Sequence, residues 1–136
     1  MQTTKDQTLE TMVKHYLICA LWTSYDDNGE NCPPPLDDNY SLEDISAETY
    51  FNAKNDCIKF LKDAENSCPK ELLEEFYTYD NELMGHNFFL NRNRHGSGFW
   101  DEKGYSKELG NYLSDICHKM GEVNFYVGDD KKIYSA

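Results

Sequence analysis

The densest group of chemically versatile side chains lies between residues 85 and 101. It holds two histidines, both arginines of the chain, three glycines and four aromatic residues. A guanidinium is a planar fork that suits phosphate, aromatic rings stack on bases, and glycines let backbone N–H groups approach an anion. The segment predicts either a nucleotide-binding loop or a glycine-rich structural turn. The candidate ligand-binding residues are His86, Arg92, Arg94, His95, Gly96, Gly98, Trp100 and Asp101.

A hydrolase or nuclease is a further hypothesis for the same stretch. His86, His95 and Asp101 are separated by 9 and 6 residues, and across a turn they could supply a base and its orienting carboxylate. The chain has no H-E-x-x-H motif and no Walker motif, and nothing supports a nucleophile elbow. We therefore assign no catalytic residue, and an enzyme is the less favoured class.

Acidic residues outnumber basic residues most strongly in the N-terminal part of the chain. The 136 residues include 25 Asp and Glu against 13 Lys and Arg, a net charge of −12, and residues 26–50 hold eight acidic residues without any Lys or Arg. Such a surface repels nucleic acid and attracts a basic protein partner, or is merely a solvated face. The candidate partner-binding residues are Asp26, Asp27, Glu30, Asp37, Asp38, Glu43, Asp44 and Glu48.

No metal or cofactor site is predicted. The acidic stretch offers oxygen ligands, but the EF-hand spacing is not met, and none of the five cysteines forms a C-x-x-C pair. Cys19, Cys57 and Cys117 fall at apolar helix positions and are expected to be buried free thiols, which indicates a reducing cytosol. The sequence also lacks a signal-peptide pattern and an apolar run of the ~18 residues that a membrane span needs.

The elements that must position these residues are helices followed by short strands. Ser46 is the expected N-cap of the second helix and Gly121 the expected C-cap signal of the last. Apolar periodicity predicts helices over 4–24, 47–66, 69–80 and 106–120. Alternation and turn residues predict one hairpin with strands at 87–92 and 99–101 and a second with strands at 123–127 and 132–134.

This order, roughly α-α-α-ββ-α-ββ, predicts an α+β fold with the N-terminal helices packed on a small antiparallel sheet. We expect a single domain over residues 1–136. Its helical half, 1–80, carries −11 of the net charge (17 acidic, 6 basic residues), and the α+β half, 81–136, carries −1.

Three segments resemble a widespread family of small bacteriophage proteins. They are GHNFFLNRN at 85–93, HGSGFWD at 95–101 and GEVNFYVGDD at 121–130 with Ile133 and Tyr134, similar to the family pattern G-H-D-F-W-L-T-R-N, H-G-A-G-F-W-D and Y-V-G-D-D. The LDDNY segment at 36–40 also resembles one that precedes the second helix in this family. This chain departs at Asn87, Phe89 and Asn91, where the family usually has Asp, Trp and Thr. The family has no agreed activity, so the resemblance implies a phage origin and an infected bacterial cytoplasm.

Together these features predict a small acidic phage accessory protein that binds and inhibits a host nucleic-acid-binding or defence protein, with nucleic-acid mimicry as one route. The alternatives are a nucleotide-binding module that uses residues 92–100 and a small hydrolase or nuclease. The expected partner is a host protein with a basic surface. No cofactor, no membrane and no direct nucleic-acid contact are expected, and the oligomeric state is left open.

Overall fold

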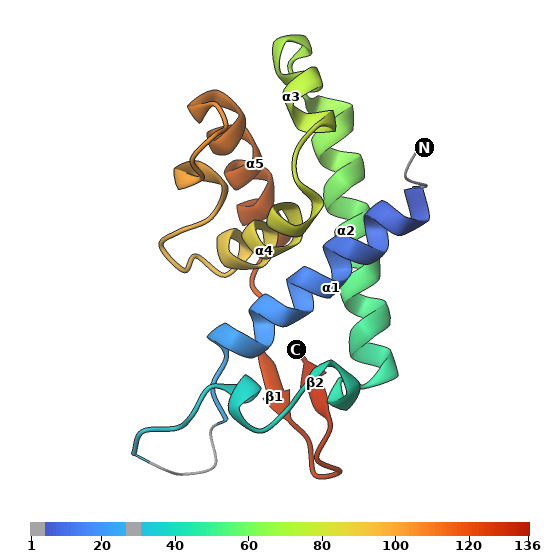
Figure 1. Cartoon of the computed structure of the whole chain (residues 1–136), viewed down its shortest axis with the longest axis vertical. Helices are drawn as coiled ribbons and strands as arrows, with labels where there is room; N and C mark the ends of the chain where they lie inside the picture. Colours follow the sequence, from blue (N-terminus) through green and yellow to red (C-terminus); the bar gives the residue numbers. More distant parts are fainter. Residues whose placement is uncertain (1–4, 27–30) are drawn as a thin grey trace.

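The computed structural model describes residues 5–26 and 31–136, with the side chains of residues 8–26 and 31–136. Helices make up most of the described chain (Figure 1). They are α1 (Lys5–Thr23), α2 (Ala47–Ser67), α3 (Leu73–Tyr77), α4 (Asn81–Arg92) and α5 (Lys107–Met120), with 3-10 turns η1 (Leu36–Asp38), η2 (Leu42–Asp44), η3 (Lys70–Leu72) and η4 (Phe99–Asp101). No helix in the described residues combines the length and the hydropathy needed to cross a membrane.

Capping explains where the long helices begin and end. The Ser46 hydroxyl accepts the Thr49 N–H and starts α2, and the Ser106 hydroxyl accepts the Leu109 N–H in the same way at α5. Gly121 follows α5 with a φ of 82°, a conformation that suits glycine. The helices expected at 4–24, 47–66 and 106–120 are therefore confirmed to within one residue at each end.

The core forms where α1 packs along α4, with α2 and α5 against them (Figure 1). Gly85 permits this close approach, because a Cβ there would collide with the backbone carbonyl of Met12. Phe88 stacks on Phe60 of α2 with ring centroids 4.5 Å apart and lies 5.3 Å from Tyr16 of α1. The core thus contains residues from both 1–80 and 81–136.

A small antiparallel sheet completes the α+β fold that the sequence predicts. Strand β1 (Phe125–Val127) pairs with β2 (Ile133–Ser135), and Tyr126 lies opposite Tyr134. The Ser46 N–H donates to the Ile133 carbonyl at 2.9 Å, so the start of α2 is fastened to the edge of β2. The hairpin and the η1–η2 segment consequently lie at the same end of the molecule (Figure 1).

The expected hairpin at 87–101 is wrong. Residues 87–92 form the second half of α4, and residues 99–101 form the 3-10 turn η4. Asp80 caps the start of the helix, and its carboxylate accepts the Leu83 N–H. Its last turns are buried on almost every side, so the apolar residues follow no clear helical period and imitate a strand.

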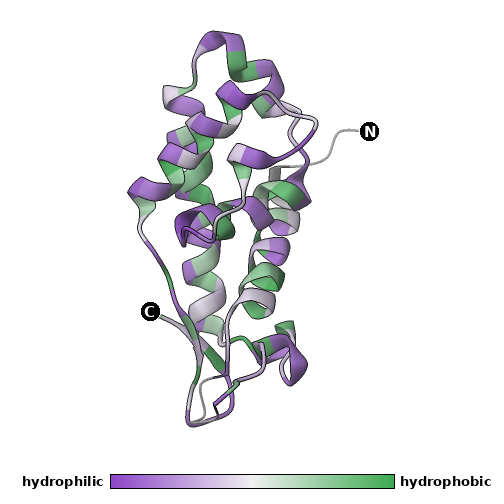
Figure 2. Cartoon of the chain, turned by 90° about the vertical axis from the view of Figure 1, so that its left-hand side faces the viewer, coloured by the Kyte–Doolittle hydropathy of each residue, from purple (hydrophilic) through white to green (hydrophobic). Residues whose placement is uncertain are grey.

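The third helix is also shorter than predicted. Residues 69–80 contain the 3-10 turn η3 and the five-residue α3, and the chain leaves the helix at Thr78. This region forms the top of the molecule in Figures 1 and 2, where hydrophilic residues predominate. Two hollows flank α3, lined by different sides of the same short helix.

Candidate functional site

The acidic stretch lies at the end of the molecule that carries η1, η2 and the hairpin. Four of its carboxylates are exposed to solvent, and we call these four the acidic face: Asp37, Asp38, Glu43 and Glu48. Asp44 has a local task, because its carboxylate accepts the Ser41 N–H at 2.8 Å. Asp26 is half-buried, whereas Asp27 and Glu30 lie outside the described residues.

The acidic face forms no ion pair with a described residue. Across the described residues, the ion pairs within 4.0 Å are His15 with Glu82 and Arg92 with Asp56, and neither involves the acidic face. The nearby hairpin turn holds two aspartates and two lysines and adds no net charge. Exposed carboxylates also occur on α3 and α5, so acidity is not confined to this end.

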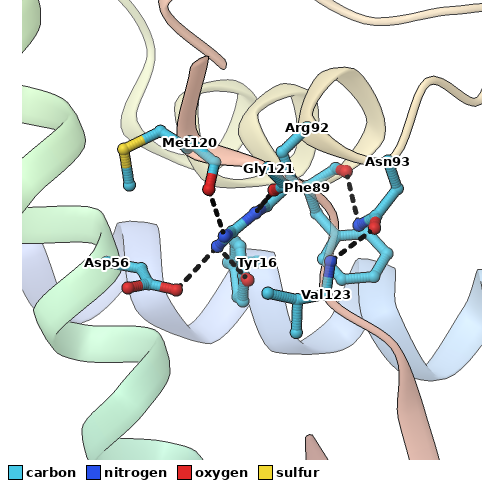
Figure 3. Close-up of polar contacts among 8 residues, drawn as sticks. All are labelled: Tyr16, Asp56, Phe89, Arg92, Asn93, Met120, Gly121 and Val123. Atoms are coloured by element: carbon cyan, nitrogen blue, oxygen red, sulfur yellow. Dashed lines mark hydrogen bonds and ion pairs between the residues drawn. The ribbon is translucent and has the colours of Figure 1, made fainter. Parts of the chain in front are cut away.

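Arg92 is a structural residue, which corrects the expectation that it binds a ligand. Only 3% of it is exposed. Its guanidinium donates to the Asp56 carboxylate at 2.7 Å and to the Tyr16 hydroxyl at 3.0 Å, and its Nε donates to the Gly121 carbonyl at 2.9 Å (Figure 3). The group also lies over the Phe88 ring, 5.2 Å from the centroid. A buried guanidinium so fully bonded is not available to a phosphate.

Asn93 continues this network from the end of α4. Its amide donates to the Phe89 carbonyl, and its side-chain oxygen accepts the Val123 N–H at 2.9 Å (Figure 3). Arg92 and Asn93 together therefore hold the connector from α5 to β1, residues 121–124, against the helices.

Gly98 also serves the fold rather than a ligand, a second correction. It is buried with a φ of 150°, and a Cβ would collide with the Asn91 side chain. Its N–H donates to the Asp101 carboxylate at 2.9 Å. The Asn91 side chain accepts the Phe99 N–H in turn. The N–H groups of Gly98 and Phe99 are thus bonded within the fold and are not free for an anion.

His86 lies on α4, away from the loop. Its ring stacks on Trp22 of α1 with centroids 6.0 Å apart. Partial burial lowers the pKa of His86, the nearby Glu102 carboxylate opposes that shift, and His15 adds to it. Asn87 beside it is buried and donates to Glu102 at 2.9 Å and to the Tyr79 hydroxyl at 3.3 Å, so position 87 has a polar structural role.

The remaining candidates of this segment do not meet in one site. His95 lines a hollow of about 310 Å³ with Tyr25, Phe89 and Asn124 among its other residues, but neither His86 nor Asp101 lines it. Arg94, Gly96 and Trp100 are exposed. The three groups required by the hydrolase hypothesis therefore share no pocket among the described residues, and the geometry gives that hypothesis no support.

Sequence reasoning missed the largely apolar pocket beside α3. It has a volume of about 410 Å³ and is bounded by α1, α2, α3 and the start of α4. It lies beside the five-residue α3, and its lining on α1 and α2 includes the partly buried Leu9 and Leu61. A helical period reveals an apolar side but not how much of it a neighbour covers.

Among the described residues, no three His, Cys, Asp or Glu side chains gather closely enough to hold a metal ion. The cysteines Cys19, Cys57 and Cys117 are free and buried, as predicted. Comparison with known proteins adds no assignment, since no protein-family model, curated protein or solved structure matches this chain.

Proposed function

We propose that this chain is a binding protein whose acidic face occupies a basic surface on another protein. The observation that carries the proposal is the set of four exposed carboxylates on residues 37–48, in a stretch without Lys or Arg and without an ion pair to a described residue. Unpaired surface charges of one sign steer oppositely charged partners and speed their encounter.

The partner in this proposal is a host protein that binds nucleic acid or defends the bacterium. A groove that binds phosphates is rich in Lys and Arg, and carboxylates can take the place of those phosphates. The resemblance of residues 85–101 and 123–130 to small phage proteins supports an infected bacterium as the setting. Inhibition by occupation of the groove requires no catalytic group.

A nucleotide-binding module is supported less well. Of the two arginines expected to bind the phosphate of a nucleotide, Arg92 is buried and bonded to Asp56 and Tyr16. Arg94 and Trp100 remain exposed, but they offer no hydrogen-bonded cradle of the kind that an anion requires.

The experiment is capture of bacterial proteins from a lysate on the immobilised chain, at low and at high salt. We expect recovery of nucleic-acid-binding proteins that are released by salt, because surface charge attraction is screened. Added duplex DNA should release the same proteins, since it competes for the same groove.

The matched control compares two triple variants with the same change in net charge. Asp37→Asn, Asp38→Asn and Glu43→Gln remove three charges of the acidic face, whereas Asp63→Asn, Asp115→Asn and Glu122→Gln remove three exposed charges elsewhere. The first variant should lose the captured proteins and the second should keep them. Equal capture by both variants, or capture that DNA does not displace, would refute the proposal.

A further inference from the structure

The pocket beside α3 is lined in part by that helix, which lies at the opposite end of the molecule from the η1–η2 segment (Figure 1). We call it the α3 groove. Its floor includes the buried side chains of Met12, Phe76 and Met84, and its α2 wall includes Ile58 and Leu61. Much more of its surface is apolar than polar, and its volume of about 410 Å³ is large enough for several bulky side chains.

The groove has the length of a short helical contact. Ile58, Leu61 and Glu65 line it at positions i, i+3 and i+7 of α2, so the wall extends over two turns, about 10 Å. Tyr77 stands at the edge with 60% of its surface exposed. An exposed tyrosine beside partly covered aliphatic side chains is typical of a surface that binds another protein.

A cluster of negative charge lies across α3 from the groove, in a second hollow. The charged side chains among the groove's described lining residues are one acidic, Glu65, and one basic, Lys62. On its other side, α3 borders a second, shallower hollow of about 700 Å³. We call this the glutamate hollow, because its described lining contains four glutamates and no Lys or Arg: Glu71, Glu74, Glu75 and Glu108.

One of these glutamates has a structural role and the others are available. Glu75 accepts hydrogen bonds from the Ser106 N–H and hydroxyl and thereby joins α3 to the start of α5. Glu71, Glu74 and Glu108 are exposed. The short helix α3 therefore separates an apolar groove from a row of solvated carboxylates.

We propose that the α3 groove binds a short amphipathic helix of a partner protein. Large apolar side chains of that helix enter the groove, and its lysines or arginines lie over α3 toward Glu71 and Glu74. Helices with an apolar stripe are the usual occupants of grooves between helices. The partner helix must be basic, because an acidic one would be repelled by the glutamates. A second copy of this chain, with its net charge of −12, does not fit that requirement.

The probe is a fluorescently labelled synthetic helix of about 18 residues, five turns, with leucines along one face and lysines elsewhere. Binding to the full chain is followed by fluorescence anisotropy. One control peptide keeps the leucines and replaces lysine by glutamate, and another keeps the lysines and replaces leucine by serine. We expect the first peptide to bind and both controls to bind at least tenfold more weakly.

Two variant pairs locate the binding site. Tyr77→Ala should weaken binding about tenfold, the equivalent of ~1.4 kcal/mol. Phe51→Ala is the control, because Phe51 is about as exposed (59%) but lies in the half of α2 that does not line the groove. This variant should bind the peptide as the native chain does. The double change Glu71→Lys and Glu74→Lys should also weaken binding, whereas Asp37→Lys and Asp38→Lys, with the same change in net charge, should not. Circular dichroism checks that each variant is folded.

Three results would overturn this inference: no binding of the leucine–lysine peptide, binding that Tyr77→Ala leaves unchanged, or an equal loss in the Asp37 and Asp38 double variant. The inference would also fail if the chain bound a small apolar dye but not the peptide. It would fail as well if sedimentation showed a dimer that the Tyr77→Ala variant no longer forms. Because the acidic face consists of other residues, at the other end of the molecule, failure of this inference would not affect the outcome of the lysate experiment.

Discussion

At the scale of single residues, the clearest test concerns the two arginines. Arg92→Met should lower the free energy of unfolding by about 3 kcal/mol, because it leaves the Asp56 carboxylate, the Tyr16 hydroxyl and the Gly121 carbonyl without their donor. Arg94→Met is the matched control and should change it by less than about 0.5 kcal/mol, since Arg94 is exposed. Urea unfolding measures both. Similar values for the two variants would refute the structural role of Arg92.

The ring of His86 gives the second residue-scale prediction, a pH dependence. Burial lowers the pKa of His86 below its usual 6.5, so the folded protein binds this proton less readily than the unfolded chain does. The stabilisation from the neutral ring is complete above pH 6.5 and declines as the pH falls toward the lower pKa of the folded state.

The measurement is a comparison of the native chain with His86→Gln. The free energy of unfolding should fall more steeply between pH 7.5 and pH 5.5, about one unit either side of the usual pKa, in the native chain than in the variant. An NMR titration that places the pKa of His86 at or above 6.5 would contradict this account.

At the scale of elements, the crossing of α1 and α4 depends on Gly85. Replacement of glycine by alanine inside a helix normally stabilises it by up to about 1 kcal/mol. Gly85→Ala should instead destabilise the protein by about 2 kcal/mol or more, because the added methyl group meets the Met12 carbonyl of α1. Asn111→Ala, at an exposed position of α5, should be neutral or slightly stabilising. A stabilised Gly85→Ala variant would show that α1 can move aside without cost.

The elements with a clear period were predictable, and those without one were not. In α1, residues such as Met12, Val13 and Tyr16 recur on one side and are all buried, so the sequence pattern and the packing agree. In α4 both sides are buried, and the strand expected at 87–92 reflects the aromatic residues rather than the backbone. The Asp80 cap, three residues before Leu83, was the local clue to the helix start.

The candidate site was predictable only in part, for a related reason. The sequence identifies a carboxylate-rich stretch, and the exposure of Asp37, Asp38 and Glu43 follows from their charge. It does not reveal that Arg92 meets Asp56, 36 residues away, because such a pairing depends on how α2 and α4 are placed. The α3 groove likewise depends on how α1, α2, α3 and α4 are placed, because all four contribute to its lining.

At the scale of the whole molecule, the thiols report the integrity of the core. Burial raises the pKa of Cys19 to about 12 and also raises the pKa of Cys57 and Cys117. The measurement is modification by a thiol reagent at pH 8, about half a unit below the usual pKa of a free thiol. The reagent should modify the exposed Cys32 first, the half-buried Cys68 more slowly and the other three thiols only on unfolding. Cys32→Ser should remove the fast phase. Rapid modification of three or more thiols in the folded protein would contradict the packing described.

The attachment of the hairpin by the last turn of α4 has a consequence for how the chain tolerates change. Arg92 and Asn93 form hydrogen bonds with main-chain atoms of the connector. Arg92 donates to the Gly121 carbonyl, and the Asn93 side chain accepts from the Val123 N–H. Every amino acid supplies that carbonyl, and every one except proline supplies that N–H. Substitutions at positions 122 and 123, except proline at 123, therefore leave both hydrogen bonds possible, whereas substitutions at 92 and 93 remove the side chains that make them.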